Sequence, residues 1–107
     1  MERVSKSTFN SSVEQAAGPV LVDFSAPWCG YCKRLAPLLD QMERQSEDQL
    51  AFVEVNVDTD PELAAALHVE AVPTLYLYQN GQHGEALVAP QSITAIRGWL
   101  RHQGVAL

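Results

Sequence analysis

The sequence predicts an α/β fold in which a central mixed β-sheet lies between two layers of helices. The chain has 107 residues and is 47% hydrophobic, which suits one core, since single domains commonly hold about 100–150 residues. Segments with helical spacing alternate with short β-rich runs along the whole chain. The turn dipeptide Asn80–Gly81 between the last two β-rich runs indicates a hairpin, and so antiparallel strands beside parallel ones. We expect one domain over residues 1–107.

The first two expected elements are a helix over Thr8–Ala17 and a strand over Val20–Ser25. Thr8 or Ser7 can cap the helix, and Gly18–Pro19 ends it. The strand is too continuously apolar to have one exposed face. This pattern is typical of a central strand that is buried on both faces.

A long helix, a strand and a short helix are expected next. Leucines at helical spacing predict a helix from Cys32 to about Gln49, with a kink at Pro37. Residues alternate between apolar and polar over Ala51–Val57, which is the period of a strand. Asp60 can then cap a short alanine-rich helix that continues to about Leu67.

The last part of the chain predicts a hairpin and a final helix. The hairpin strands are Thr74–Gln79 and about Glu85–Val88. Ser92 can cap a helix that continues to about His102. The expected order is helix, strand, helix, strand, helix, strand, strand, helix, and its early β-α-β units favour parallel pairing.

Charge and hydropathy exclude two classes of partner. Seven basic residues stand against 13 acidic ones, a formal net charge of −6, which argues against nucleic acid and anionic membrane surfaces. The longest apolar run is Leu63–Leu67, far below the roughly 20 residues of a membrane span. Residues 1–18 lack the apolar core of a secretory signal. We therefore expect a cytoplasmic protein, although a processed exported chain would have the same sequence.

The two cysteines, Cys29 and Cys32, form a C-x-x-C pair between an expected strand and an expected helix. Cα atoms three residues apart in a helix are separated by about 5 Å, within the range that a disulfide accepts. Such a short loop stabilises a fold little, so the pair suits reversible redox chemistry better than a structural role. Two small core residues, or a zinc or iron–sulfur site shared between two chains, are the alternatives.

Position along the helix separates the roles of the two thiols. Cys29 lies before or at the first helical residue, where free N–H groups and the helix dipole lower a thiol pKa, so it is expected to be the attacking thiolate. Cys32 lies one turn further in and is expected to resolve the mixed disulfide. Asp23 is an acid in the middle of a buried strand, where burial raises a carboxyl pKa. Its alternative role is purely structural, with a carboxylate satisfied by hydrogen bonds.

The stretch VDFSAPWCGYCK, from Val22 to Lys33, resembles the active-site strand and helix of the thioredoxin family. The run Val72–Thr74 and the Asn80–Gly81 turn follow at the expected distances. The region from Ala26 to Pro37 also resembles protein disulfide isomerase domains. The resemblance implies a thioredoxin-like three-layer α/β/α fold with a central mixed sheet, and a thiol–disulfide oxidoreductase that reduces protein disulfides.

The resemblance also implies residue roles. Cys29 matches the nucleophile, Cys32 the resolving cysteine, and Asp23 the buried acid that relays a proton to or from the resolving cysteine. Pro73 matches the family's cis-proline, although spacing alone does not establish a cis bond. The expected substrate-binding residues are Trp28, Gly30, Tyr31, Val72 and Pro73.

The expected partners follow from the same resemblance. They are oxidised protein substrates and a thioredoxin reductase that uses FAD and NADPH, with no cofactor bound to this domain, and the expected state is a monomer. Two alternatives remain. One is an oxidase or isomerase of the same fold, and the other is a binding or chaperone module in which the cysteines are dispensable.

Three residues depart from the family pattern. Tyr31 stands where typical thioredoxins have proline, and it either frees an N–H that makes the couple more oxidising or is a tolerated surface residue. Glu54 stands where bacterial thioredoxins often have lysine, and it either titrates together with Asp23 or points to solvent. Ala89 lies close to the position of a glycine in the family's substrate-binding loop.

Overall fold

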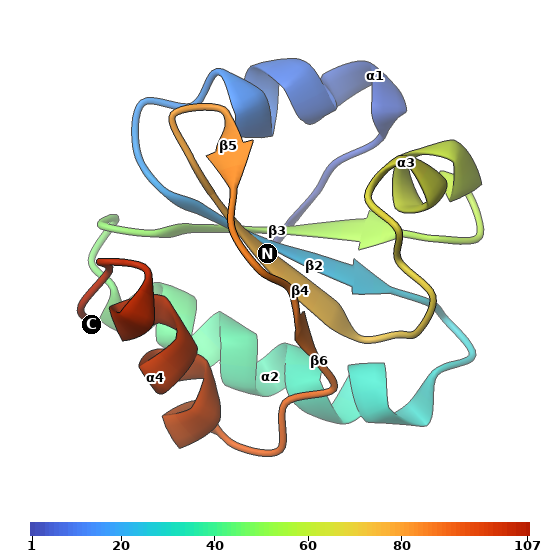
Figure 1. The fold of residues 1–107 in the computed structure, drawn as a ribbon. Coiled ribbons are helices and arrows are strands. Elements are labelled where there is room, and N and C mark those ends of the chain that lie inside the picture. The colour runs from blue at the N-terminus through green and yellow to red at the C-terminus, as the bar shows by residue number, and fades with distance from the viewer.

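A computed structural model describes all residues from 1 to 107 as a six-stranded sheet between two layers of helices (Figure 1). The strands are β1 (Glu2–Arg3), β2 (Val20–Ser25), β3 (Ala51–Asn56), β4 (Thr74–Gln79), β5 (Gln82–His83) and β6 (Leu87–Val88). The helices are α1 (Lys6–Phe9), its π-helical continuation η1 (Asn10–Glu14), α2 (Gly30–Gln45), α3 (Pro61–Ala66) and α4 (Ile93–His102). None of these helices combines the length and the apolar character that a bilayer crossing requires.

The sheet is mixed, as the sequence predicts. Its strand order is β1-β3-β2-β4-β5, and β6 also pairs with β4. The strands β1, β3 and β2 run parallel, whereas β4 runs antiparallel to β2, β5 and β6. All six residues of β2 are buried, which confirms the prediction of a central strand.

Two apolar clusters fill the space between the sheet and its helices. α1, η1 and α3 cover one face of the sheet, and α2 and α4 cover the other (Figure 1). Phe24 and Tyr76 belong to the cluster on the first face, and Leu21 and Leu75 to the cluster on the second. Because side chains alternate along a strand, Asp23 of β2 shares the second face with Leu21. The position of Asp23 under α2 is thus set by the strand period.

The N-terminal region differs from the prediction. The helix begins at Lys6 after Ser5, whose backbone N–H donates to Thr8 Oγ1 at 2.9 Å, so neither Ser7 nor Thr8 is the cap. A strand that the sequence analysis missed, β1, precedes it. Two residues are too few to show a period, and β1 exists because it pairs with β3. Propensity along the chain carries no information about such a partner.

Two further boundaries differ. The helix α2 ends at Gln45 rather than near Gln49, because Glu47 and Asp48 adopt left-handed φ angles of 51° and 68° that no helix contains. The hairpin turn at Asn80–Gly81 is confirmed, with φ angles of 54° and 78° at its two residues. The strand expected over Glu85–Val88 is wrong in extent. β5 forms directly after the turn, and only Leu87–Val88 pairs again with β4.

Candidate active site

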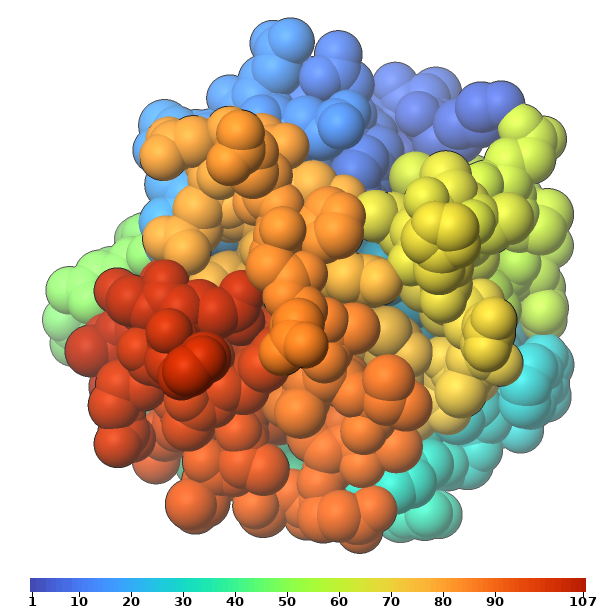
Figure 2. All heavy atoms as spheres, in the orientation of Figure 1, coloured from blue at the N-terminus to red at the C-terminus, as the bar shows by residue number.

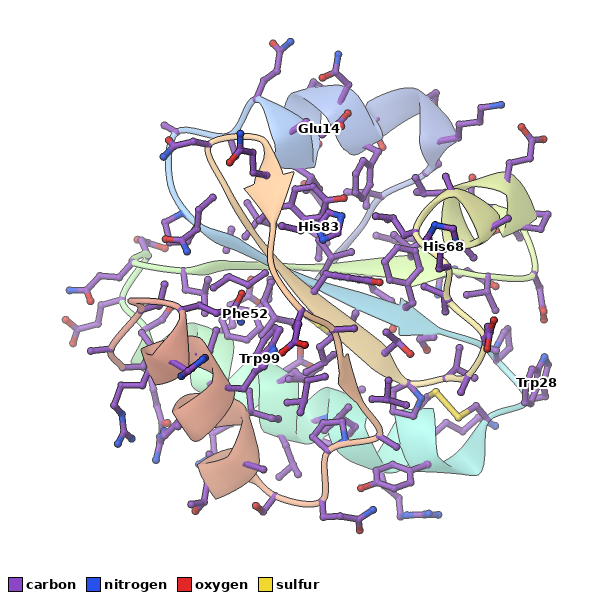
Figure 3. All side chains as sticks on the ribbon, in the orientation of Figure 1. Glu14, Trp28, Phe52, His68, His83 and Trp99 are labelled. Carbon is purple, nitrogen blue, oxygen red and sulfur yellow. A yellow bond between two sulfur atoms is a disulfide. The ribbon has the colours of Figure 1, made fainter.

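The two cysteines lie where β2 has ended and α2 begins. The backbone N–H of Cys29 donates to the carbonyl of Ala26 at 3.1 Å, and this turn leads into α2 at Gly30. A disulfide joins Cys29 to Cys32, with 5.3 Å between the Cα atoms, as the helical spacing predicts (Figure 3). The structure therefore holds the oxidised form of the pair.

The sulfur of Cys29 lies within the field of the helix N-terminus. Cys29 is the N-cap residue of α2, and its Sγ accepts the backbone N–H of Cys32 at 3.1 Å. The carbonyl oxygen of Val72 lies 3.8 Å from the same sulfur. An N–H donor and the dipole of a 16-residue helix both favour a negative charge on Cys29 once the disulfide is reduced. No comparable donor to the Cys32 sulfur is seen.

The loop before β4 closes the site on its other side. Its Val72–Pro73 peptide bond is cis, which resolves the question that spacing left open. Figure 2 shows this segment (yellow) packed beside the start of α2 (cyan). The carbonyl of Pro73 accepts the N–H of Ala89 at 2.9 Å, so the segment after β6 is tied to the same loop. Ala89 has a φ of 46°, a left-handed conformation that favours glycine.

Trp28 and Val72 line an apolar pocket beside the disulfide. Trp28 is 69% exposed and stands at the edge of the molecule (Figure 3). Its indole Nε1 donates to Asp58 Oδ1 at 3.3 Å, which fixes the ring. The pocket has a volume of about 130 Å³ and is lined by Trp28, Val57, Val69, Glu70, Ala71 and Val72.

Tyr31 lies in a different pocket from Trp28. Its hydroxyl donates to the carbonyl of Pro90, and the Arg34 guanidinium lies 5.4 Å from the centre of its ring. This second pocket, of about 260 Å³, lies between α2 and the segment after β6. Of the residues expected to bind substrate, Tyr31 thus lines one pocket, and Trp28 and Val72 line the other. The sequence analysis missed Pro90, because nothing local indicates a contact 59 residues away.

Gly30 is the first residue of α2, and it is exposed. A Cβ added there would meet only the Arg34 guanidinium, at an ordinary 3.6 Å. Space alone therefore does not require glycine at this position.

Asp23 lies in the middle of β2, on the face of the sheet that α2 covers. It is 0% exposed, and neither carboxylate oxygen has a hydrogen-bond partner. Burial raises its pKa to about 7, and the negative charge of Glu54 adds to the effect. No group of the protein supplies the hydrogen bonds that the structural alternative requires.

Glu54 lies beside Asp23, and the two residues are register partners on β3 and β2. Its carboxylate accepts from the Arg3 guanidinium at 3.1 Å. The negative charge of Glu54 raises the pKa of Asp23, which favours the first of the two alternatives over a side chain that acts only on solvent. The sequence did not predict the position of Arg3, because it did not predict β1, the strand that carries this residue.

The site contains the parts of a reversible dithiol. Two cysteines at disulfide distance occupy the N-terminus of α2, an apolar pocket adjoins them, and a buried acid lies on the sheet face that the same helix covers. No group of three or more histidine, cysteine, aspartate or glutamate side chains gathers into a metal site. Fold and site together define a thioredoxin-fold protein with a redox-active cysteine pair.

Comparisons with known proteins agree with this class. The family model described as thioredoxin matches residues 1–102. Thioredoxin 1 of Synechococcus elongatus is 37% identical over 97 residues, which cover 91% of each chain. Thioredoxin 1 of Nostoc sp. is 40% identical over 86 residues, 80% of each chain. The chain belongs to the thioredoxin family.

A longer relative carries the same domain beside a second function. The bifunctional thioredoxin reductase/thioredoxin of Mycobacterium leprae is 38% identical over 93 residues, which are 87% of this chain and 20% of that protein. Membership of the family and the close cysteine pair make this protein a thiol–disulfide oxidoreductase.

Proposed function

We propose that the protein works as a reductant of protein disulfides, with Cys29 as the nucleophile. The observation that carries this assignment is the position of the Cys29 sulfur. It caps α2, accepts the N–H of Cys32, and adjoins the apolar pocket of Trp28 and Val72. The sulfur that the helix N-terminus stabilises as a thiolate is the one that attacks.

The reaction proceeds in two exchanges. The Cys29 thiolate attacks one sulfur of the substrate disulfide, a mixed disulfide forms, and the other substrate sulfur leaves as a thiolate. Cys32 then loses its proton and attacks the Cys29 sulfur, which releases the second substrate thiolate. The two substrate thiolates take up protons, so two electrons pass to the substrate and the Cys29–Cys32 disulfide remains.

Asp23 takes the proton from Cys32 in the second exchange. An acid with a pKa of about 7 is half ionised near neutral pH, so it can both accept and return a proton there. The absence of hydrogen-bond partners supports this role, because no fixed donor holds the carboxylate in its ionised form.

The substrate segment binds across the cysteine pair. Trp28 and Val72 supply apolar contacts, and the Val72 carbonyl, 3.8 Å from the Cys29 sulfur, is placed to accept a substrate N–H. Pro73 holds that carbonyl in place, exposed Gly30 leaves room for a backbone to approach, and Tyr31 lines the pocket on the far side.

A thioredoxin reductase that uses NADPH and FAD returns the pair to the dithiol, while this domain binds no cofactor. The reductase fused to the domain in the Mycobacterium leprae relative supports this partner. We further propose that residues 1–107 act as a single domain, as a monomer, in the cytoplasm.

The test is the reduction potential of the Cys29–Cys32 couple, measured by equilibration in glutathione buffers. A reductant of the thioredoxin type is expected near −270 mV, at roughly −250 mV or below. A value above roughly −200 mV would contradict the proposal and assign the protein to disulfide formation or isomerisation. A Cys32→Ser variant, which cannot close the disulfide, is the control that ties the signal to this pair.

A further inference from the structure

Three charged side chains form a row across three neighbouring strands of the sheet. Arg3 of β1 is the register partner of Glu54 in β3, and Glu54 is the register partner of Asp23 in β2. Partners in a ladder project to the same face of the sheet. The row continues into β4 with Leu75, which belongs to the apolar cluster under α2. The charged groups therefore lie on the cysteine side of the sheet.

Exposure rises in steps along this row. The Asp23 side chain is fully buried, the Glu54 side chain is 21% exposed, and the Arg3 side chain is 68% exposed. The Arg3 guanidinium and the Glu54 carboxylate form an ion pair at 3.1 Å. The row thus connects a carboxylate without a partner in the core to a solvated charge at the edge of the sheet.

A pocket extends beside these charged side chains, from α2 to β1 at the edge of the sheet. It has a volume of about 190 Å³, and its lining includes Cys32, Glu54 and Arg3. That volume holds several water molecules, and Ser25 and Asn56 add polar side chains to its wall. Lys33 is the one further charged residue that lines it. Most of the residues that line this pocket are polar or charged, whereas most of those that line the pocket beside Trp28 are hydrophobic.

The catalytic cycle requires such a route. A proton that passes from Cys32 to Asp23 must leave the core before the next turnover, and Asp23 itself has no contact with solvent. Glu54 is its partly exposed neighbour on the next strand. Leu75 on the other side is apolar and closes that direction.

We propose that Glu54 and Arg3 are positioning residues for disulfide exchange, which form the outer part of a proton path between Asp23 and solvent and set the pH at which that path works. The inference rests on the proposed role of Asp23 as proton acceptor. Glu54 disfavours ionisation of Asp23, because like charges repel. Arg3 neutralises Glu54 and so limits that repulsion. The chain thereby supplies from β1 a positive charge next to Glu54.

The experiment compares Glu54→Gln and Arg3→Gln with the unsubstituted protein. The carboxyl carbon of Asp23 is titrated by ¹³C NMR in the reduced protein, and the rate at which Cys32 resolves a mixed disulfide with a small aromatic thiol is measured from pH 5 to pH 9. Glu54→Gln is expected to lower the pKa of Asp23, and the midpoint of the rate profile, by about 0.5–1. Arg3→Gln is expected to raise both by about 0.3–0.5, less because Arg3 is exposed.

Two matched variants control for net charge. Glu2→Gln removes an acid next to Arg3 on β1, but its register partner Val53 belongs to the cluster on the opposite face. Lys6→Gln removes a cation that pairs with Glu62, away from the pocket. Both are expected to move the Asp23 midpoint by less than about 0.2, because exposed charges at a distance are screened.

The outcomes separate this inference from the proposed role of Asp23. The proton path is supported if the midpoints of the Asp23 titration and of the rate profile move in opposite directions in Glu54→Gln and Arg3→Gln. These midpoints must also remain unchanged in the two control variants. Lower rates at every pH with unmoved midpoints would overturn it, since that is the effect of a structural role. If Asp23→Asn abolishes the pH midpoint of the resolution rate while Glu54→Gln and Arg3→Gln leave that midpoint unchanged, the proton path is wrong and the role of Asp23 stands. If Asp23→Asn keeps the midpoint, the role of Asp23 fails as well.

Discussion

The two faces of the sheet differ in whether a buried polar side chain has a hydrogen-bond partner. On the face covered by α1, η1 and α3, the Tyr76 hydroxyl is buried, and it donates to the carbonyl of Leu67 at 2.7 Å. On the face covered by α2 and α4, Asp23 is buried and both its oxygens lack partners. Buried polar groups are nearly always hydrogen-bonded, and an unpaired one costs free energy.

The difference between the faces separates structure from chemistry. A satisfied hydroxyl adds stability and leaves nothing free to react. An unsatisfied carboxylate lowers stability whenever it is ionised, but it exchanges a proton close to neutral pH. The fold places that group on the sheet face covered by α2, the helix that carries Cys32. The four predictions that follow test whether the two faces do differ in this way.

The largest expected effect belongs to the cysteine pair on the α2 face. Cys29→Ser should lower the rate of protein disulfide reduction by at least about 10³-fold, because a hydroxyl is a far weaker nucleophile than a thiolate. Cys32→Ser should instead accumulate a mixed disulfide with the substrate. Mass spectrometry of the products distinguishes the two variants, and a stable adduct on Cys32 in Cys29→Ser would reverse the assignment of roles.

The next largest effect is on stability, at Asp23. Its pKa is about 7 in the folded protein against an ordinary value of 3.8, so folding favours the protonated acid. That contribution is complete below about pH 4 and is lost as the pH rises through 7. Asp23→Asn should therefore be more stable than the unsubstituted protein by about 3–5 kcal/mol at pH 8–9.

Urea unfolding from pH 4 to pH 9 measures this difference. The excess stability of Asp23→Asn should shrink steadily as the pH falls and approach its minimum near pH 4. A difference that does not change with pH would show that Asp23 titrates normally in the fold, which would remove the contrast between the two faces.

Tyr76→Phe provides the matching substitution on the other face. It removes the hydroxyl and leaves the Leu67 carbonyl without its donor, which should cost about 1–2 kcal/mol of unfolding free energy. The loss should be the same at pH 5 and at pH 8, because this hydrogen bond carries no charge. Disulfide exchange should proceed at the original rate. A slower exchange would mean that both faces contribute to the chemistry.

The smallest effect is expected at Tyr31. Its hydroxyl donates to the Pro90 carbonyl at a partly exposed position, so Tyr31→Phe should cost only about 0.5–1 kcal/mol. Thermal unfolding measures this loss. If the bond positions the segment after β6 for substrate, KM for a protein disulfide should rise while the potential of the couple stays constant. A changed potential with constant KM would point instead to an electronic effect on Cys29.

Local patterns predicted most of this fold. The apolar run of β2, the Asn80–Gly81 turn and the cap at Ser92, which accepts the N–H of Ala95, are all set by a few neighbouring residues. The same holds for the cysteine pair, whose spacing along a helix fixes its geometry. Asp23 was identified because an acid within an apolar strand is unusual.

Contacts between distant segments were not predictable in this way. β1 is two residues long and exists through its partner β3, so the position of Arg3 beside Glu54 has no local signal. The bond from Tyr31 to Pro90 joins residues that only the fold brings together. The end of α2 depended on left-handed conformations at Glu47 and Asp48, neither of which is a glycine. For β1 and for the Tyr31 bond, the deciding contact comes from a distant segment, which local preference does not reveal.

The most direct test of the central claim, that Asp23 accepts the proton of Cys32, is the rate of mixed-disulfide resolution as a function of pH. It is measured by stopped flow from pH 5 to pH 9 in the unsubstituted protein and in Asp23→Asn. The claim predicts a rate that rises through about pH 7, and a variant that is at least about tenfold slower and lacks this rise. Equal rates with the same pH profile in both proteins would contradict it.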